Sequence, residues 1–130
     1  MNIPSNLLYH REHEWVRVED DDVAVIGISD YAQGQLGDIV YLELPAVGDE
    51  IEDREEPFGQ IESVKAMSDL FSPVTGTVIR VHEELIDTLT PINEDPYGEG
   101  WMIAVKMNDP SQLDELMTAS EYERFLEEQG

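Results

Sequence analysis

The sequence contains no cysteine. A disulfide framework, a zinc site built on thiolates and a cysteine nucleophile are therefore excluded. Histidines are also few, and His10, His13 and His82 show no metal-ligand spacing with carboxylates. Packing or solvated roles are expected for them. Any redox-active thiol or disulfide must arrive with a cofactor.

Basic residues are scarce as well. Only 7 lysines and arginines stand against 30 aspartates and glutamates, which gives a formal net charge of −23. A nucleic acid backbone needs clustered Lys and Arg to displace its counterions, and anionic membranes attract the same residues. Neither is expected as a partner. The acidity predicts a well-solvated surface, with steering toward basic protein partners as a second interpretation.

Long apolar runs are missing too. No stretch reaches the roughly 18 consecutive apolar residues that indicate a transmembrane helix. The segment Met1–Tyr9 lacks the positively charged start and apolar run of a signal peptide. We therefore expect a soluble, intracellular protein, and a transit peptide removed from the mature chain would leave no trace.

The residues that are present suit one domain over 1–130. Hydrophobic residues make up 41% of the chain, which is enough for one core. Apolar β-branched and aromatic runs, separated by Gly, Pro and acidic turns, predict short strands. The expected strands cover residues 15–18, 23–28, 39–44, 58–64, 70–71, 74–81 and 101–107. No long helical crossover separates them, which favours a mainly β sandwich or flattened barrel over a βαβ sheet.

Helices are predicted from their end signals. Ser29 is expected to cap a short helix through Leu36, with Gly37 as the left-handed residue that ends it. Two more helices are expected within 109–129 and should pack on the sheet. Their predicted starts are Asp109 with Gln112 as a capping-box partner, and a second box formed by Ser120 and Glu123.

Two segments of the chain show a weak internal sequence similarity. The run Gly37–Leu42 resembles Gly76–Val81, with Gly, two β-branched residues and a further aliphatic residue in matching places. Chance would explain such a match in a strand-rich chain. Two similar β units facing each other about an approximate two-fold axis would also explain it, and we favour this interpretation.

One lysine stands alone between two strand-like runs. Lys65 is the only lysine in the first 105 residues, and no Gly, Pro or Asn beside it explains a turn. Taken by itself, an exposed lysine on a hairpin is ordinarily a solubilising residue.

The segment around this lysine changes that interpretation. The run Glu62–Asp69, which reads ESVKAMSD, resembles the lipoylation segment of glycine cleavage H proteins. Further landmarks of that family occur in its order and near its spacing over almost the whole chain. They are His13-Glu14-Trp15, Gly27-Ile28-Ser29-Asp30, Ala32-Gln33, Leu36-Gly37-Asp38, Leu44-Pro45, Ser72-Pro73-Val74, Gly76, Asn93, Pro96-Tyr97 and Gly100-Trp101-Met102. Their joint occurrence makes coincidence a poor explanation.

The resemblance implies a non-enzymatic carrier that bears lipoic acid as an amide on Lys65. It implies a flattened β-barrel or sandwich of the lipoyl and biotinyl carrier type, with this lysine on a hairpin. Glu62 and Gly76 match the residues associated in the family with recognition by lipoylating enzymes, either a lipoate-protein ligase or a lipoyl or octanoyl transferase. The alternative for Gly76 is a strand or turn glycine, and both roles are compatible.

The partners implied by the resemblance are the P, T and L proteins of the glycine cleavage system. The carrier would take an aminomethyl group from the pyridoxal-phosphate-dependent P protein to the tetrahydrofolate-dependent T protein, and pass electrons to the flavoprotein L. We expect a monomer, in the cytoplasm of a prokaryote or in the mitochondrial matrix of a eukaryote.

Family matching also suggests Glu14 and Asp69 as carboxylates that line a cleft for the arm. The alternative for both is an ordinary acidic surface residue. Tyr31 stands where many members carry His, and Glu12 where a small hydroxyl residue also occurs, so the polarity of that cleft is an open question.

Two rival interpretations remain. Another lipoyl or biotinyl swinging-arm domain is disfavoured by the chain length, the His13-Glu14-Trp15 segment and the C-terminal helices. Biotinyl domains also usually carry Met on both sides of the lysine, whereas Val64 and Ala66 flank Lys65. A small hydrolase or lyase with paired carboxylates has no supporting nucleophile or phosphate motif.

Overall fold

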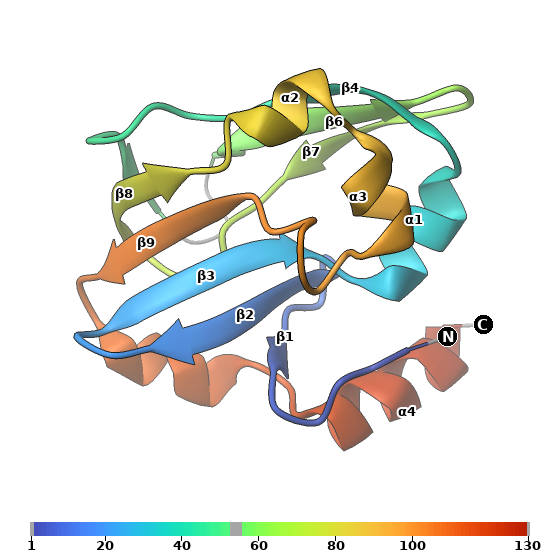
Figure 1. The fold of residues 1–130 in the computed structure, drawn as a ribbon. Helices are drawn as coiled ribbons and strands as arrows, with labels where there is room; N and C mark the ends of the chain where they lie inside the picture. The colour runs from blue at the N-terminus through green and yellow to red at the C-terminus, as the bar shows by residue number, and fades with distance from the viewer. Residues whose placement is uncertain (1, 53–55, 130) are drawn as a thin grey trace.

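The computed structural model describes residues 2–52 and 56–129. Its strands form two antiparallel sheets, and the smaller sheet lies above the larger one in Figure 1. The larger sheet contains, in spatial order, β1 (Leu8–Tyr9), β2 (Glu14–Glu19), β3 (Val23–Ile28), β9 (Ile103–Met107), β8 (Gly76–Val81) and β5 (Glu50–Ile51). The smaller contains β4 (Ile39–Glu43), β6 (Gly59–Ser63) and β7 (Met67–Leu70). The predicted mainly β sandwich is confirmed.

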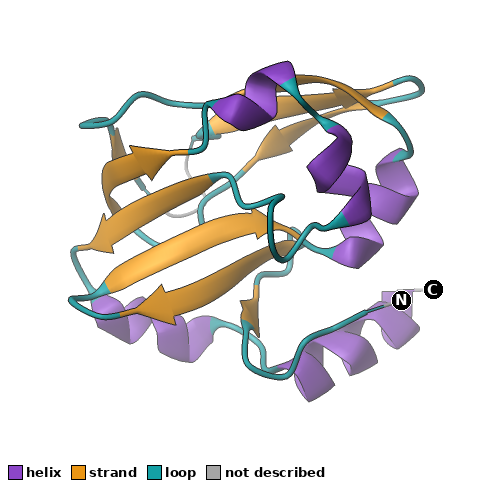
Figure 2. Cartoon of the chain, in the orientation of Figure 1, coloured by secondary structure: helices purple, strands orange, loops and turns teal. Residues whose placement is uncertain are grey.

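The helices gather in two places (Figure 2). The short helices α1 (Asp30–Leu36), α2 (Glu84–Asp87) and α3 (Thr90–Glu94) lie along the smaller sheet and at one end of the sandwich. The 3₁₀ helix η1 (Pro110–Glu115) and α4 (Ala119–Gln129) lie on the other side of the larger sheet. None of the described helices is long and apolar enough to cross a membrane.

Strand β3 is buried along its whole length because it faces two clusters. Ala24 and Ile26 pack into the core between the sheets, whereas Val23 and Val25 pack toward Tyr122 of α4. Alternate side chains of a strand point to opposite faces. Strand β3 therefore contributes side chains to both hydrophobic clusters, which explains why its sequence is a continuous apolar run.

The predicted caps of α1 are confirmed. The Ser29 hydroxyl accepts the N–H of Ala32, and Gly37 ends the helix with φ +83°. Side-chain capping satisfies one of the helix's unpaired N–H groups, and glycine is the residue that tolerates the positive φ.

The first C-terminal helix differs from the prediction. It is a 3₁₀ helix, and although Asp109 accepts the N–H of Ser111 as a cap, Gln112 does not close a capping box. Instead, the Gln112 carbonyl accepts the N–H of Thr75 at 2.7 Å, and its amide reaches the Thr75 hydroxyl at 3.3 Å. The Gln112 side chain therefore bonds to Thr75, which is distant in sequence, instead of capping its own helix.

The second C-terminal helix begins two residues earlier than its predicted box. In α4 the box is formed by Thr118 and Glu121: the Glu121 carboxylate accepts the N–H of Thr118, and the Thr118 hydroxyl accepts the N–H of Glu121. The predicted pair, Ser120 and Glu123, was wrong. Both pairs have the same spacing, and the packing of Tyr122 against the larger sheet selects between them.

The internal similarity between Gly37–Leu42 and Gly76–Val81 has a structural counterpart. β4 lies in the smaller sheet and β8 in the larger, and each strand has a register shift, between Ile39 and Tyr41 in β4 and between Val78 and Arg80 in β8. These shifts occupy the same place when Gly37 is aligned with Gly76. The shared irregularity supports two similar β units, while the two-fold axis stays a prediction.

Four elements have no counterpart among the predictions: β1, β5, α2 and α3. The two strands are two residues long, and the two helices span about one turn each. Segments this short carry no measurable hydrophobic period.

Candidate functional site

Lys65 lies on the turn that joins β6 to β7, as predicted. The turn is organised by Ser63, whose hydroxyl accepts the N–H of Lys65 at 3.3 Å and of Ala66 at 3.0 Å. The Ser63 N–H donates to the Ala66 carbonyl at 2.7 Å. A serine hydroxyl can stand in for a backbone acceptor in a tight turn, so this turn forms without Gly or Asn.

A second contact holds the turn against the start of β4. The Val64 N–H donates to the Asp38 carbonyl at 3.1 Å. The side chain of Lys65 lies over Gly37, because a Cβ built at Gly37 would be 3.5 Å from Lys65 Cε and 4.0 Å from Nζ. The lysine is exposed, so its amine is presented to solvent on a fixed backbone.

Asn93 of α3 secures the segment beneath the lysine. Its amide donates to the Gly37 carbonyl at 2.9 Å and to the Gln33 side chain at 3.0 Å, and its carbonyl accepts the N–H of Ile39 at 3.2 Å. One side chain therefore joins the end of α1 to the start of β4. Sequence reasoning missed this role, although Asn93 was one of the family landmarks.

Ser63 was missed as well. Its sequence signal is a serine two residues before the lysine, where its hydroxyl can accept the lysine N–H. That signal is weak by itself, since serine is common in loops.

Glu62 and Asp69 point to the outer face of the smaller sheet. Glu62 is paired with Met67, and Asp69 with Gln60, whose amide donates to the Asp69 carboxylate at 3.3 Å. Asp69 is exposed and Glu62 is half-buried. Both carboxylates are therefore available to a partner that approaches this face.

Glu14 is in a different environment. Its side chain is 2% exposed and lies 2.9 Å from Nδ1 of His10, while Phe71 donates its N–H to the other carboxylate oxygen at 3.3 Å. Burial raises the pKa of the Glu14 carboxyl well above its usual range, and the Phe71 N–H opposes that shift. Glu14 is therefore buried whereas Asp69 is exposed, and their shared role in lining a cleft for the arm stays a prediction.

Gly76 is buried where β8 meets β9. A Cβ at this position would lie 2.0 Å from the Lys106 carbonyl oxygen and 2.7 Å from a methyl group of Val105. The interpretation as a strand glycine is confirmed, since no side chain fits there. Its part in recognition by lipoylating enzymes stays a prediction, and burial leaves only an indirect route for it.

The other two histidines, His13 and His82, lie against aromatic side chains. His13 lies 2.9 Å from the Tyr122 hydroxyl, and His82 stacks on Trp101 with ring centroids 4.5 Å apart. Within the described residues, no group of three acidic or histidine side chains is placed to hold a metal ion.

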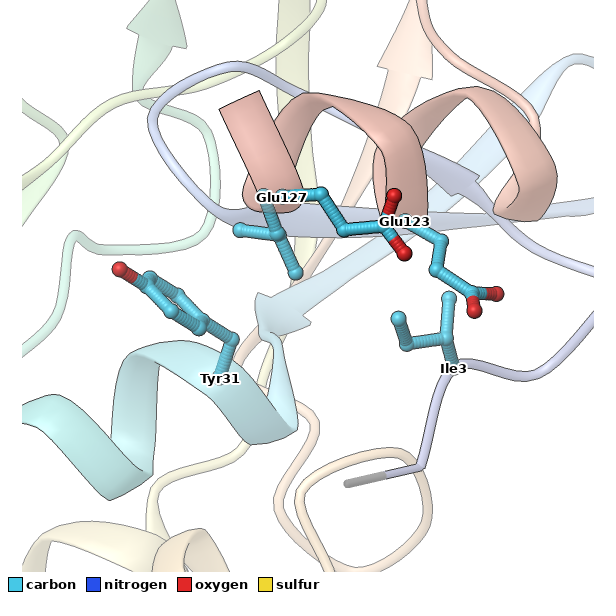
Figure 3. Close-up of a pocket in the computed structure, with 5 residues that line it drawn as sticks. Ile3, Tyr31, Glu123 and Glu127 are labelled. Atoms are coloured by element: carbon cyan, nitrogen blue, oxygen red, sulfur yellow. The ribbon is translucent and has the colours of Figure 1, made fainter. Parts of the chain in front are cut away.

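A groove of about 510 Å³ lies away from the lysine turn. In Figure 3, Tyr31 of α1 faces the acidic side chains of α4 across this groove. Its lining consists of Ile3, Tyr31, Glu123, Leu126 and Glu127. None of the predicted site residues belongs to it, but it contains Tyr31, one of the two departures from the family pattern.

Comparison with known proteins covers nearly the whole chain. The family model of the glycine cleavage H-protein matches residues 7–129. The glycine cleavage system H protein of Carboxydothermus hydrogenoformans is 53% identical over 128 residues, which cover 98% of this chain and 97% of the relative. That of Halalkalibacterium halodurans is 54% identical over 128 residues, with 98% of each chain covered.

A solved structure agrees with these relatives. The crystal structure of a glycine cleavage system H protein from Mycobacterium marinum is similar with a TM-score of 0.84 at 36% identity, covering 92% of this chain and 95% of that one. The resemblance carried by the sequence motifs is confirmed: this chain belongs to the glycine cleavage H-protein family.

Proposed function

We propose that this protein is the lipoyl-bearing carrier of a glycine cleavage system and that Lys65 carries the lipoyl group. The observation that supports this most directly is the presentation of Lys65. An exposed amine stands on a turn that Ser63 fixes from one side and Gly37 supports from the other. This turn lies within a chain that matches the H-protein family over residues 7–129.

The residues at the turn fit an amide-linked arm. A hairpin turn can enter an acylating enzyme's active site without the sheet unfolding, because the hydrogen bonds between β6 and β7 stay intact. The aliphatic stem of Lys65 lies over Gly37, and that contact involves Cε, which is the same whether the side chain ends in an ammonium or an amide. When attached, lipoate supplies a dithiolane that accepts an aminomethyl group and electrons.

The proposed partners follow from that role. The carrier would take the aminomethyl group from the glycine decarboxylase (P protein) to the aminomethyltransferase (T protein), and electrons to dihydrolipoyl dehydrogenase (L protein). A tethered group reaches each partner at high effective concentration without dissociating from the carrier. The net charge of −23 favours partners whose docking surfaces are basic. In this proposal the bond-breaking and redox steps are catalysed by the partners with their cofactors, and the carrier catalyses no step.

Intact-mass spectrometry tests the proposal. Incubation with lipoate, ATP and a lipoate-protein ligase should add the mass of one lipoyl group, and peptide mapping should place it on Lys65. Lys106 is an internal control, because it lies on β9 and its ammonium contacts the Asp21 carbonyl. The variant Lys65→Arg should keep its fold and accept no lipoyl group, since a guanidinium cannot form this amide. Modification of Lys106, or none at Lys65, would refute the assignment.

A further inference from the structure

Three side chains form a row across the outer face of the smaller sheet. Tyr41 of β4 is paired with Glu62 of β6, and Glu62 is paired with Met67 of β7. Residues directly opposite each other on neighbouring strands point to the same face. Tyr41, Glu62 and Met67 are therefore neighbours, although 25 residues lie between the first and the last in the sequence. We call this set the Tyr41 row.

The Tyr41 row exposes apolar surface among carboxylates. Tyr41 is 47% exposed and Met67 is 63% exposed, with Glu62 half-buried between them. The Tyr41 hydroxyl donates to the Glu43 carboxylate at 3.3 Å, and the nearby charges of Glu43 and Glu62 raise the pKa of that phenol above its usual range. Asp69 lies one row further along the same face. Exposed aromatic and methionine side chains inside a charged rim are typical of protein docking sites.

The position of the Tyr41 row beside the lysine turn favours one kind of partner. Glu62 and Met67 stand directly before and after the turn formed by Ser63–Ala66. An enzyme that acylates Lys65 must bring an activated carbonyl within bonding distance of its Nζ, so it has to cover the residues flanking this turn. Enzymes that act on the dithiolane at the far end of the arm are separated from the turn by the length of the arm, so they need not contact the residues that flank it.

We propose that the Tyr41 row is the docking site for the enzyme that attaches the lipoyl group. This rests on the proposed function. Of the three residues in the row, the family resemblance implies a role only for Glu62, whereas the sheet register adds Tyr41 from a distant strand and Met67 beyond the lysine. The matching surface of the enzyme should combine an apolar contact for the Tyr41 and Met67 side chains with basic groups for Glu43, Glu62 and Asp69.

The test uses threonine substitutions, which keep β-propensity while removing the apolar contact. Tyr41→Thr and Met67→Thr are made singly and together in the full chain. Val18→Thr is the matched control, since Val18 is 49% exposed on β2 of the other sheet. Initial rates of lipoylation by a lipoate-protein ligase are measured over a range of carrier concentrations, and thermal unfolding is followed for every variant.

The double variant should lose about tenfold in kcat/KM for lipoylation, mainly through a raised KM, as expected when docking anchors are removed. Val18→Thr should match the wild type. Once longer incubation has fully lipoylated every variant, the flavoprotein should reduce and reoxidise their lipoyl groups at the wild-type rates. Unchanged lipoylation of the double variant, or an equal loss in the flavoprotein step, would overturn the inference. Lipoylation of the wild type on Lys65 would in either case leave the proposed function standing.

Discussion

The Lys65 side chain lies beside Gly37, since a Cβ at Gly37 would be in ordinary van der Waals contact with Lys65 Cε at 3.5 Å. Gly37 also adopts φ +83° and ψ −154°, a conformation that is essentially restricted to glycine. The residue that ends α1 thus also supports the stem of the lysine. Helix termination and presentation of the attachment site depend on the same backbone.

Replacing Gly37 by Ala should lower the free energy of unfolding by about 1–3 kcal/mol, the usual cost of forcing such a conformation on a residue with a Cβ. Gly34 provides the control. It lies inside α1, and a Cβ added there would have no heavy atom within 4 Å, so Gly34→Ala should stabilise the protein by about 0.5–1 kcal/mol. Urea unfolding measures both. Equal effects of the two substitutions would contradict the strained geometry at Gly37.

Removal of the Ser63 hydroxyl should loosen the lysine turn. Ser63→Ala removes the acceptor of the N–H groups of Lys65 and Ala66, and because both residues are exposed, water can replace it, so we expect a cost of about 0.5–1.5 kcal/mol in unfolding free energy. Lipoylation should slow as the lysine loses its fixed backbone. Ser68→Ala, at an exposed position of β7, is the control for stability and should leave the unfolding free energy unchanged. Chemical denaturation and lipoylation rates are the measurements, and a Ser63→Ala protein as stable as the control would remove Ser63 from this role.

Gly76→Ala should destabilise the sheet strongly, because its methyl group would overlap the Lys106 carbonyl. Overpacking typically costs about 1–3 kcal/mol and occasionally more, and the overlap with a backbone oxygen places this variant at the upper end. At a temperature where the variant remains folded, its lipoylation rate should stay close to that of the wild type if Gly76 acts only through strand packing. A stable variant that is lipoylated slowly would instead indicate direct recognition.

The buried pair of His10 and Glu14 predicts a specific pH dependence. Because the pKa of Glu14 is raised in the folded protein, the folded state binds this proton more tightly than the unfolded chain does. The stability that the proton contributes is fully present below the unfolded value near 4.5 and is lost as pH rises through the folded pKa. Glu14→Gln removes this loss while keeping the shape of the side chain.

The stability of Glu14→Gln relative to the wild type should therefore improve as pH increases from about 5 to about 8. Both proteins share the repulsion of the remaining carboxylates, so the difference between their unfolding free energies comes from Glu14 and its contact with His10. Urea unfolding at several pH values supplies that difference. A gap that stays constant, or that favours the wild type at high pH, would show that Glu14 is ionised in the folded state.

The sequence by itself determined those features that depend on neighbours along the chain. Apolar β-branched runs predicted the longer strands, and Ser29 and Gly37 marked both ends of α1, because capping and left-handed turns involve residues only a few positions apart. Lys65 was identified from its own segment and from landmarks in linear order. Its presentation on a hairpin was implied by the family resemblance.

Tertiary structure decided everything that depends on distant partners. Thr118 and Ser120 offer the same capping signal to Glu121 and Glu123, and packing of α4 on the larger sheet selects the first pair. Glu14 has an acidic side chain like the other 29 aspartates and glutamates, and only the fold buries it against His10. Tyr41 joins Glu62 through sheet register alone. Contacts across a sheet link residues far apart in sequence, and the pattern of either strand read alone does not encode them.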